Sequence, residues 1–230
     1  MAVLLSTAYF PPVEYFAAMA EEMVLSDDKT ISSAIVWIEA KENFQKQSWR
    51  NRCCIYAAEG PQNLSFPIIH EHGTHQLPIS KIKIDYSVGW VTQHKRAIIS
   101  AYRSSAYFEY YCDELFSILD SRPERLFDLN LKLIDFFLEK THISVEIRLT
   151  EDFIIPQTSS DQILEPYGKD LRNVIHPKRK NNILHSLDLE KPYFQVFAQK
   201  HGFVPNLSIM DLLFNEGPDS IIFLKKFSNR

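Results

Sequence analysis

The chain has 230 residues, of which 45% are hydrophobic and 23% charged, proportions of a globular domain that exclude a disordered, collagen-like or coiled-coil chain. Its 25 Lys and Arg against 29 Asp and Glu give a formal charge of −4, which argues against nucleic acid as the partner. Three cysteines are too few for a disulfide scaffold and fit a reducing cytoplasm.

The N-terminal residues are apolar but carry no positive charge, and the run stops at Pro11 and Pro12. This is too short for a signal peptide or a membrane span. No other stretch reaches about 18 uncharged apolar residues. We therefore expect no membrane span and a cytoplasmic location.

The first 40 residues predict a βαβ unit. Residues 2–8 read as a short buried strand, residues 13–24 as a helix with an apolar side, and residues 34–38 as a second apolar strand. This order favours a parallel pair, with the loop after the first strand at the carboxyl edge of the sheet. The expected fold class is α/β, with a Rossmann-like βαβ unit and a mixed sheet, then a helical segment and a mixed C-terminal part.

The remaining elements follow from periodicity and turn residues. We predict a hairpin over 52–57 and 63–69, a half-exposed strand over 81–85, helices over 90–103, 106–119 and up to 140, and a strand over 143–149. Capping boxes are expected at Ser121 to Glu124 and at Ser208 with Asp211. Residues 152–192 predict loops and short helices. We expect one domain over 1–230, with sub-lobes at 1–89, 90–150 and 151–230.

The densest cluster of polar residues follows the second strand. In an extended segment Arg50 and Arg52 would share one face and grip an anion together, with Asn51 on the other side. Lys46 would add a mobile charge and Trp49 a stacking plane. Alternatively, this is a solvated loop whose arginines pair with acidic neighbours, Glu39 or Glu42. The candidate ligand-binding residues here are Gln45, Lys46, Ser48, Trp49, Arg50, Asn51 and Arg52.

The loop from Tyr9 to Tyr15 joins the first strand to the first helix, whose free amides suit a phosphate. It occupies the position of the nucleotide-binding loop of HIGH-type nucleotidyltransferases, in which a proline precedes paired histidines. Here neither His nor Gly is present, so the catalytic version is not supported. A proline-stiffened turn is the alternative, and Tyr9 is kept as a stacking candidate.

Histidines offer two further candidates. His94 lies on one face of a predicted helix with Tyr102, and its ordinary pKa range suits a general acid or base or a phosphate contact. A surface histidine bonded to a neighbour is the alternative. His70, His72 and His75 lie in a glycine-containing loop without a Cys or Asp at metal-site spacing, so we expect loop histidines and no metal site.

The C-terminal part mixes core residues with polar ones. Gln195, His201 and Asn206 are free to contact a ligand, whereas Ser208 and Asp211 suffice as a helix cap. The run 178–180 reads as a solvated basic segment. Neither a P-loop nor a G-x-G-x-x-G motif is present, so no motif identifies a cofactor.

Three segments resemble one known family. Residues 6–16, residues 45–52 and the tail 203–215 are similar to the WbqC-like protein family, and the resemblance spans nearly the whole chain and points to the Bacteroidetes branch. Many members have Gln-Pro before the first loop and a Pro-Trp-x-Gly turn, where this chain has Thr7-Ala8 and Val13-Glu14. Some members belong to O-antigen or surface-polysaccharide gene clusters. The resemblance therefore implies modification of a nucleotide sugar, by aminoacyl or acyl transfer.

Together these observations predict a cytoplasmic, transferase-like protein of surface polysaccharide synthesis. Lys46, Arg50 and Arg52 would hold a phosphate-bearing or other anionic small molecule, Trp49 or Tyr9 would stack on it, and His94 would transfer a proton. The alternative is a ligand-binding or scaffold protein without catalysis. Donor, acceptor and oligomeric state are left open.

Overall fold

The computed structural model describes residues 2–25, 31, 32, 34–70, 76–156 and 163–226. The strands are β1 Ala2–Ser6, β2 Val24–Leu25, β3 Ile31–Ser32, β4 Ala34–Glu39, β5 Arg52–Ala57, β6 Gly60–Ser65, β7 Val145–Leu149, β8 Ile163–Leu164 and β9 Gly168–Asp170. The helices are α1 Val13–Glu21, α2 Trp90–Tyr102, α3 Phe108–Asp120, α4 Leu126–Lys140, α5 Ile183–Ser186, α6 Ala198–His201, α7 Ile209–Glu216 and α8 Ser220–Leu224.

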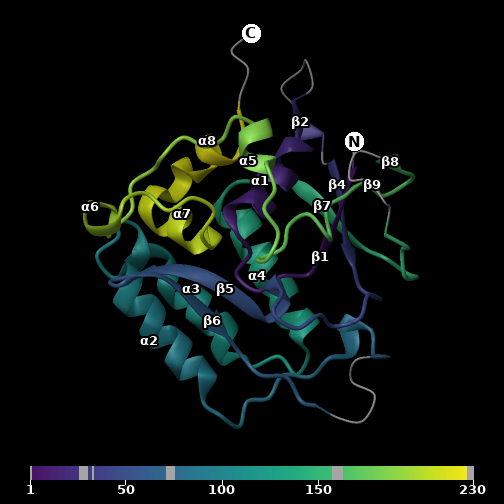
Figure 1. Ribbon diagram of the computed structural model, residues 1–230, viewed down its shortest axis with the longest axis horizontal. Helices are drawn as coiled ribbons and strands as arrows, with labels where there is room; N and C mark the ends of the chain where they lie inside the picture. The colour runs from purple at the N-terminus through teal and green to yellow at the C-terminus, as the bar shows by residue number, and fades with distance from the viewer. Residues whose placement is uncertain (1, 26–30, 33, 71–75, 157–162, 227–230) are drawn as a thin grey trace.

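The main sheet has the strand order β7-β4-β1-β9-β8, in which the first four strands are parallel and β8 is antiparallel to β9. The α/β class and the N-terminal βαβ unit are thus confirmed. In Figure 1 this sheet lies to the right of the hairpin formed by β5 and β6. The chain leaves β1 toward β4 on one side and later returns to its other side with β9. The strand order therefore reverses between β1 and β9, which is where open α/β sheets bind ligands.

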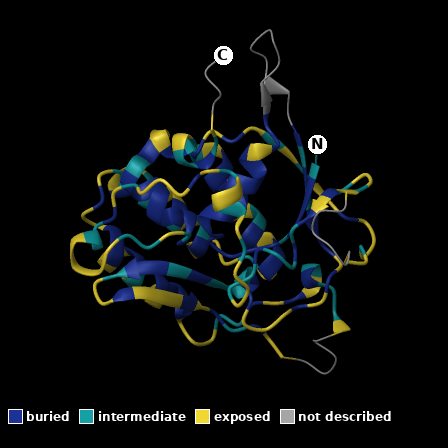
Figure 2. Cartoon of the chain, turned by 45° about the horizontal axis from the view of Figure 1, so that its top comes forward, coloured by how far each residue is buried: buried dark blue, intermediate teal, exposed yellow. Residues whose placement is uncertain are grey.

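Apolar residues explain which faces are buried. In β4, Ala34, Val36 and Ile38 are buried, whereas Ile35 and Trp37 on the opposite face are half-buried. Aromatic rings join the helices beside the sheet, since Phe137 of α4 lies 5.9 Å from Phe16 of α1 between ring centroids. Figure 2 shows burial concentrated in the middle of the molecule and exposure in the outer loops. The core thus holds the strand ends in fixed positions.

Strand β9 was not expected, because Gly168–Asp170 is too short and polar to show an alternating pattern. Gly168 has a φ of +75°, and a Cβ there would lie 1.7 Å from the backbone oxygen of Ala2. Only glycine lets the chain approach β1 this closely. The central sheet therefore takes strands from all three of the expected sub-lobes.

Two local predictions are wrong. Residues 81–85 form no strand. Lys81 is the last residue of a short 3₁₀ helix, Ile79–Lys81, and after it Lys83 and Ile84 form only isolated bridges. The first capping box is absent because the Ser121 hydroxyl donates to the Ile118 carbonyl and so ends α3, while α4 begins only at Leu126.

The second capping box forms only in part. The Ser208 hydroxyl accepts the backbone N–H of Met210 and so caps α7. Asp211 is fully buried, and its carboxylate accepts hydrogen bonds from Tyr193 and Gln195 instead of closing the box. The capping signal placed the start of α7 correctly and gave Asp211 the wrong partner.

Within the described ranges, no helix combines the length and the apolar character needed to cross a membrane. Of the histidine cluster, His72 and His75 lie outside the described residues.

Candidate functional site

A small pocket lies where the strand order reverses, between the chain segments that leave β1 and β9. It is lined by Leu5, Ser6, Thr7, Ala8, Tyr15, Trp49, Arg50, Leu171, Arg172 and Ile175. The pocket therefore joins the loop after the first strand, the basic block and the unexpected strand β9. We call it the switch-point pocket.

Two polar atoms of residues lining this pocket lack a partner. The Thr7 hydroxyl and the Trp49 indole N–H are buried and make no hydrogen bond with any described residue. The Tyr15 hydroxyl, by contrast, donates to the Ser6 carbonyl at 2.8 Å. An unpaired buried polar group costs about 1–3 kcal/mol. The pocket offers only about 10 Å³ to water-sized molecules, so one water molecule or one small group of a ligand would supply a partner there.

Arg50 is held in an ion pair beneath the pocket. Its Nε and Nη2 donate to the two carboxylate oxygens of Glu42 at 2.9 and 2.5 Å, and Nη2 also donates to Ser6 Oγ at 2.8 Å. Its Nη1 donates to Gln45 Oε1 at 3.3 Å. Burial raises the pKa of Glu42, and the charge and hydrogen bonds of Arg50 oppose that rise.

Arg172 forms a second, equally buried pair. Its Nε and Nη2 donate to the two oxygens of Asp170 at 2.9 and 2.6 Å, and its Nη1 donates to Glu39 Oε2 at 2.8 Å. Glu39 also accepts a 2.6 Å hydrogen bond from the Thr150 hydroxyl. Five charged side chains thus meet at the carboxyl ends of β1, β4 and β9.

The joint grip of Arg50 and Arg52 on an anion does not form in this geometry. Residues 49–51 make a 3₁₀ turn rather than an extended strand, and the Arg50 carbonyl accepts a 2.9 Å hydrogen bond from buried Asn130. Arg52 instead begins β5, with its Nε buried and unpaired among the described residues. The alternative interpretation, in which an arginine of this block pairs with Glu42, describes Arg50.

Two exposed lysines lie in or against the block 45–52, which supplies Trp49 and Arg50 to the pocket. Lys46 is exposed, and Lys178 donates from its Nζ to Gln47 Oε1. Burial, and after it the charges of Arg179, Arg50 and Lys178, lower the pKa of His176. The basic run 178–180, interpreted from sequence as a solvated segment, therefore lies beside the block 45–52. The sequence shows that this run is basic, but its position depends on strand β9, which the sequence did not predict.

His94 is buried away from this pocket. The Tyr9 hydroxyl donates to its Nδ1 at 2.8 Å, and its Nε2 donates to the Ser65 carbonyl at 3.2 Å. Because a carbonyl only accepts, Nε2 carries the proton. Burial lowers the pKa of His94 to about 4, so the ring is neutral at pH 7. Its role in proton transfer stays a prediction.

Several other expected ligand-binding side chains hydrogen-bond within the protein. Asn206 Oδ1 accepts the Glu14 N–H at 3.0 Å and so occupies the start of α1, where a phosphate was expected. Gln195 donates to Val204 and Asp211. The Ser48 hydroxyl donates to the Gln45 carbonyl at 2.6 Å, and the Asn51 amide donates to the Phe66 carbonyl at 2.7 Å. The hydroxyl of Tyr102, another expected ligand-binding residue on the helix of His94, accepts the Tyr56 N–H at 3.1 Å.

Comparison with known proteins supports the resemblance found in the sequence. The model of the WbqC-like protein family matches residues 7–223. The chain belongs to the WbqC-like protein family. It is also 24% identical, over 96% of each chain, to a Mycobacterium tuberculosis (strain ATCC 25618 / H37Rv) protein described as "Uncharacterized protein Rv1507c". No solved structure matches it significantly.

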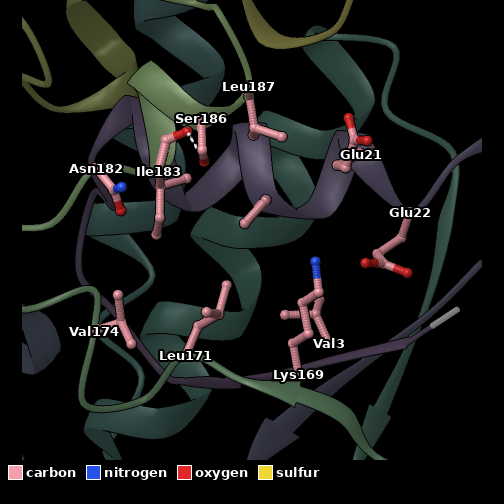
Figure 3. Close-up of a pocket in the computed structure, with 11 residues that line it drawn as sticks. Val3, Glu21, Glu22, Lys169, Leu171, Val174, Asn182, Ile183, Ser186 and Leu187 are labelled. Atoms are coloured by element: carbon pink, nitrogen blue, oxygen red, sulfur yellow. Dashed lines mark hydrogen bonds between the residues drawn. The ribbon is translucent and has the colours of Figure 1, made fainter. Parts of the chain in front are cut away.

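This WbqC-like chain has a second, larger cavity between α1, β9 and α5, which offers water-sized molecules about 170 Å³ (Figure 3). Its walls mix apolar and polar residues, with Glu21, Glu22 and Lys169 at one end. Glu21 and Lys169 are exposed, so water screens their charges. The buried, unpaired Thr7 hydroxyl instead favours the switch-point pocket as the functional site.

Proposed function

We propose that this WbqC-like protein binds a phosphate-bearing donor, a nucleotide sugar or an acyl or aminoacyl donor, at the carboxyl edge of the sheet, with one small group of the donor in the switch-point pocket, and acts as a transferase in bacterial surface-polysaccharide synthesis. One observation carries the proposal. The buried hydroxyl of Thr7, unpaired among the described residues, belongs to a residue that lines the pocket at the reversal of strand order, where a ligand group would supply its partner.

The charges around the pocket support an anionic donor. Arg50 and Arg172 are each paired with carboxylates, so their function in this proposal is to fix the pocket wall rather than to grip phosphate. The exposed Lys46 and Lys178 would bind the phosphate groups, because a lysine side chain is a mobile point charge that suits phosphate binding. The anion-binding role thus moves from Arg50 and Arg52 to the lysines.

Transfer would proceed by positioning. An acceptor hydroxyl or amine forms the new bond, and the nucleotide or thiol leaves with the electron pair of the broken bond. The acceptor's proton passes to solvent water, because His94, the base expected from the sequence, is buried away from the pocket with both ring nitrogens hydrogen-bonded.

Thr7→Val tests this function. The substitution removes a hydroxyl without a partner, so the free protein should melt at the same temperature as wild type or higher. Wild-type protein should be stabilised by one class among ATP, UDP- and dTDP-sugars and acyl-CoA, by about 2.7 kcal/mol at a ligand concentration near 100 times Kd. We expect Thr7→Val to lose that shift.

The matched control is Thr141→Val, because the Thr141 hydroxyl is equally buried but donates to the Phe137 carbonyl at 2.6 Å. This variant should melt lower and keep the ligand shift. An unchanged shift in Thr7→Val, or no shift of the wild type with any donor, would contradict the proposal.

Ligand binding without catalysis is the second candidate function. It is favoured by the state of the ionisable groups, since Arg50 and Arg172 are engaged in ion pairs and His94 is neutral with both ring nitrogens hydrogen-bonded. Donor turnover that a folded His94→Ala variant loses would exclude this candidate. Donor binding without turnover would favour it.

A further inference from the structure

A third hollow, distinct from the cavity in Figure 3, shares Arg172 with the switch-point pocket as a lining residue. It is open to solvent and offers water-sized molecules a volume of about 160 Å³, many times the volume that one water molecule needs. Its other lining residues are Glu42, Asn43, Gln45, Phe153, Pro156 and Asn173. A molecule bound here would lie next to one in the switch-point pocket.

Three of the residues that line this hollow, Asn43, Gln45 and Asn173, have side-chain amides with hydrogen-bonding groups left unpaired among the described residues. The amides of Asn43 and Asn173 make no hydrogen bond with any described residue, and Gln45 uses only its Oε1, toward Arg50. An amide both donates and accepts, as a hydroxyl group does. Several amides around one hollow therefore match a ligand that carries several hydroxyl groups.

Phe153 adds an apolar platform at a fixed place. Its residue is 51% exposed, yet the next residue is anchored on both sides, since the Ile154 N–H donates to Glu39 at 3.1 Å and its carbonyl accepts from Arg172 at 2.7 Å. The buried ion pairs thus hold the segment that presents the ring. An aromatic ring packs well against the C–H face of a sugar ring, which is apolar although its edges are polar.

The charged side chains at the hollow are already engaged in ion pairs, two guanidinium groups with three carboxylates. Glu42 is paired with Arg50, and Arg172 with Asp170 and Glu39. A strongly anionic ligand would find no free guanidinium there, whereas a neutral ligand can accept and donate hydrogen bonds at its walls. We infer that this hollow binds a neutral carbohydrate, which stacks on Phe153 and hydrogen-bonds to Asn43, Gln45 and Asn173.

The inference rests on the proposed function in one respect, since it names the sugar as the acceptor that lies beside the donor. Its test uses the methyl glycosides of glucose, galactose, mannose, N-acetylglucosamine and rhamnose as probes. Saturation-transfer NMR on the full-length protein should show binding of at least one of them. Phe153→Ala and Asn173→Ala should each weaken that binding about tenfold, the loss expected for one good contact.

Ile155→Ala is the matched control, because Ile155 is 76% exposed in the same segment but does not line the hollow, and this variant should bind as wild type does. Thr7→Val separates the two proposals, since it should lose donor binding and keep glycoside binding. If no probe binds, or if binding survives both Phe153→Ala and Asn173→Ala, the carbohydrate site is disproved whatever the donor result.

Discussion

Buried carboxylates occur in two regions of this protein with opposite surroundings. At the carboxyl edge of the sheet, Glu39, Glu42 and Asp170 each face a guanidinium group. In the C-terminal region, Asp211 at the start of α7 receives hydrogen bonds only from uncharged groups, the Tyr193 hydroxyl at 2.7 Å and the Gln195 amide at 2.8 Å.

The difference teaches what a guanidinium contributes that a neutral donor does not. Burial raises the pKa of Asp211 to about 6, and hydrogen bonds from Tyr193 and Gln195 offset only part of that rise. A full positive charge returns much more of the desolvation cost than a neutral donor does. The sheet edge is therefore built around ion pairs, and the C-terminal region around an acid whose pKa burial raises to about 6.

The largest effect should come from removing a cation at the sheet edge. Arg172→Met leaves Glu39 and Asp170 buried without their partner, and we expect a loss of about 3–5 kcal/mol in the free energy of unfolding at pH 7. Urea unfolding measures it.

Arg148→Met is the control, because the Arg148 pair with Glu146 is half-exposed on β7 and should contribute less than about 1 kcal/mol. If the two variants lost equal stability, the buried ion pairs of Arg172 would contribute no more to the free energy of unfolding than the half-exposed pair of Arg148 does. The comparison between the two regions would then lose its basis.

Removing the charge of Asp211 should act in the opposite direction. Because its pKa of about 6 in the folded state exceeds the unfolded value of about 3.9, the stability that this group confers is present below pH 4 and is lost as the pH rises through 6. That difference corresponds to about 3 kcal/mol. The stability of Asp211→Asn relative to wild type should therefore rise by up to this amount between pH 4 and pH 7.5.

Unfolding measured at several pH values tests this, with Asp120→Asn as the control, since Asp120 is exposed and pairs with Lys95. The control should show no comparable rise. A pH-independent difference between Asp211→Asn and wild type would mean that the Asp211 environment does not disfavour its charge.

The same contrast shows how far the sequence alone could reach. Long periodic runs predicted β1, α1, β4, α2, α3 and α4, because local patterning decides such elements. The pairing of Arg50 with Glu42 stood among the alternatives, since only eight residues separate them. The contact between Arg172 and Glu39 spans 133 residues and depends on the short, polar strand β9, for which no periodic signal exists. The lack of a hydrogen-bond partner for the Thr7 hydroxyl could not be predicted from the sequence either, because it depends on the assembled fold.

The smallest expected effect separates hydrogen bonding from charge at Asp211. Tyr193→Phe removes one donor to the ionised carboxylate, so the pKa of Asp211 should rise further and stability at pH 7.5 should fall by about 1 kcal/mol. At pH 4, where Asp211 is protonated in both proteins, the loss should be smaller. In an Asp211→Asn background the pH dependence of the Tyr193→Phe cost should vanish, a double-mutant cycle that isolates the pair. An equal cost at both pH values would show that the Tyr193 hydroxyl contributes by packing and not by stabilising the ionised Asp211 carboxylate. The proposed contrast between Asp211 and the carboxylates paired with arginine would then be wrong.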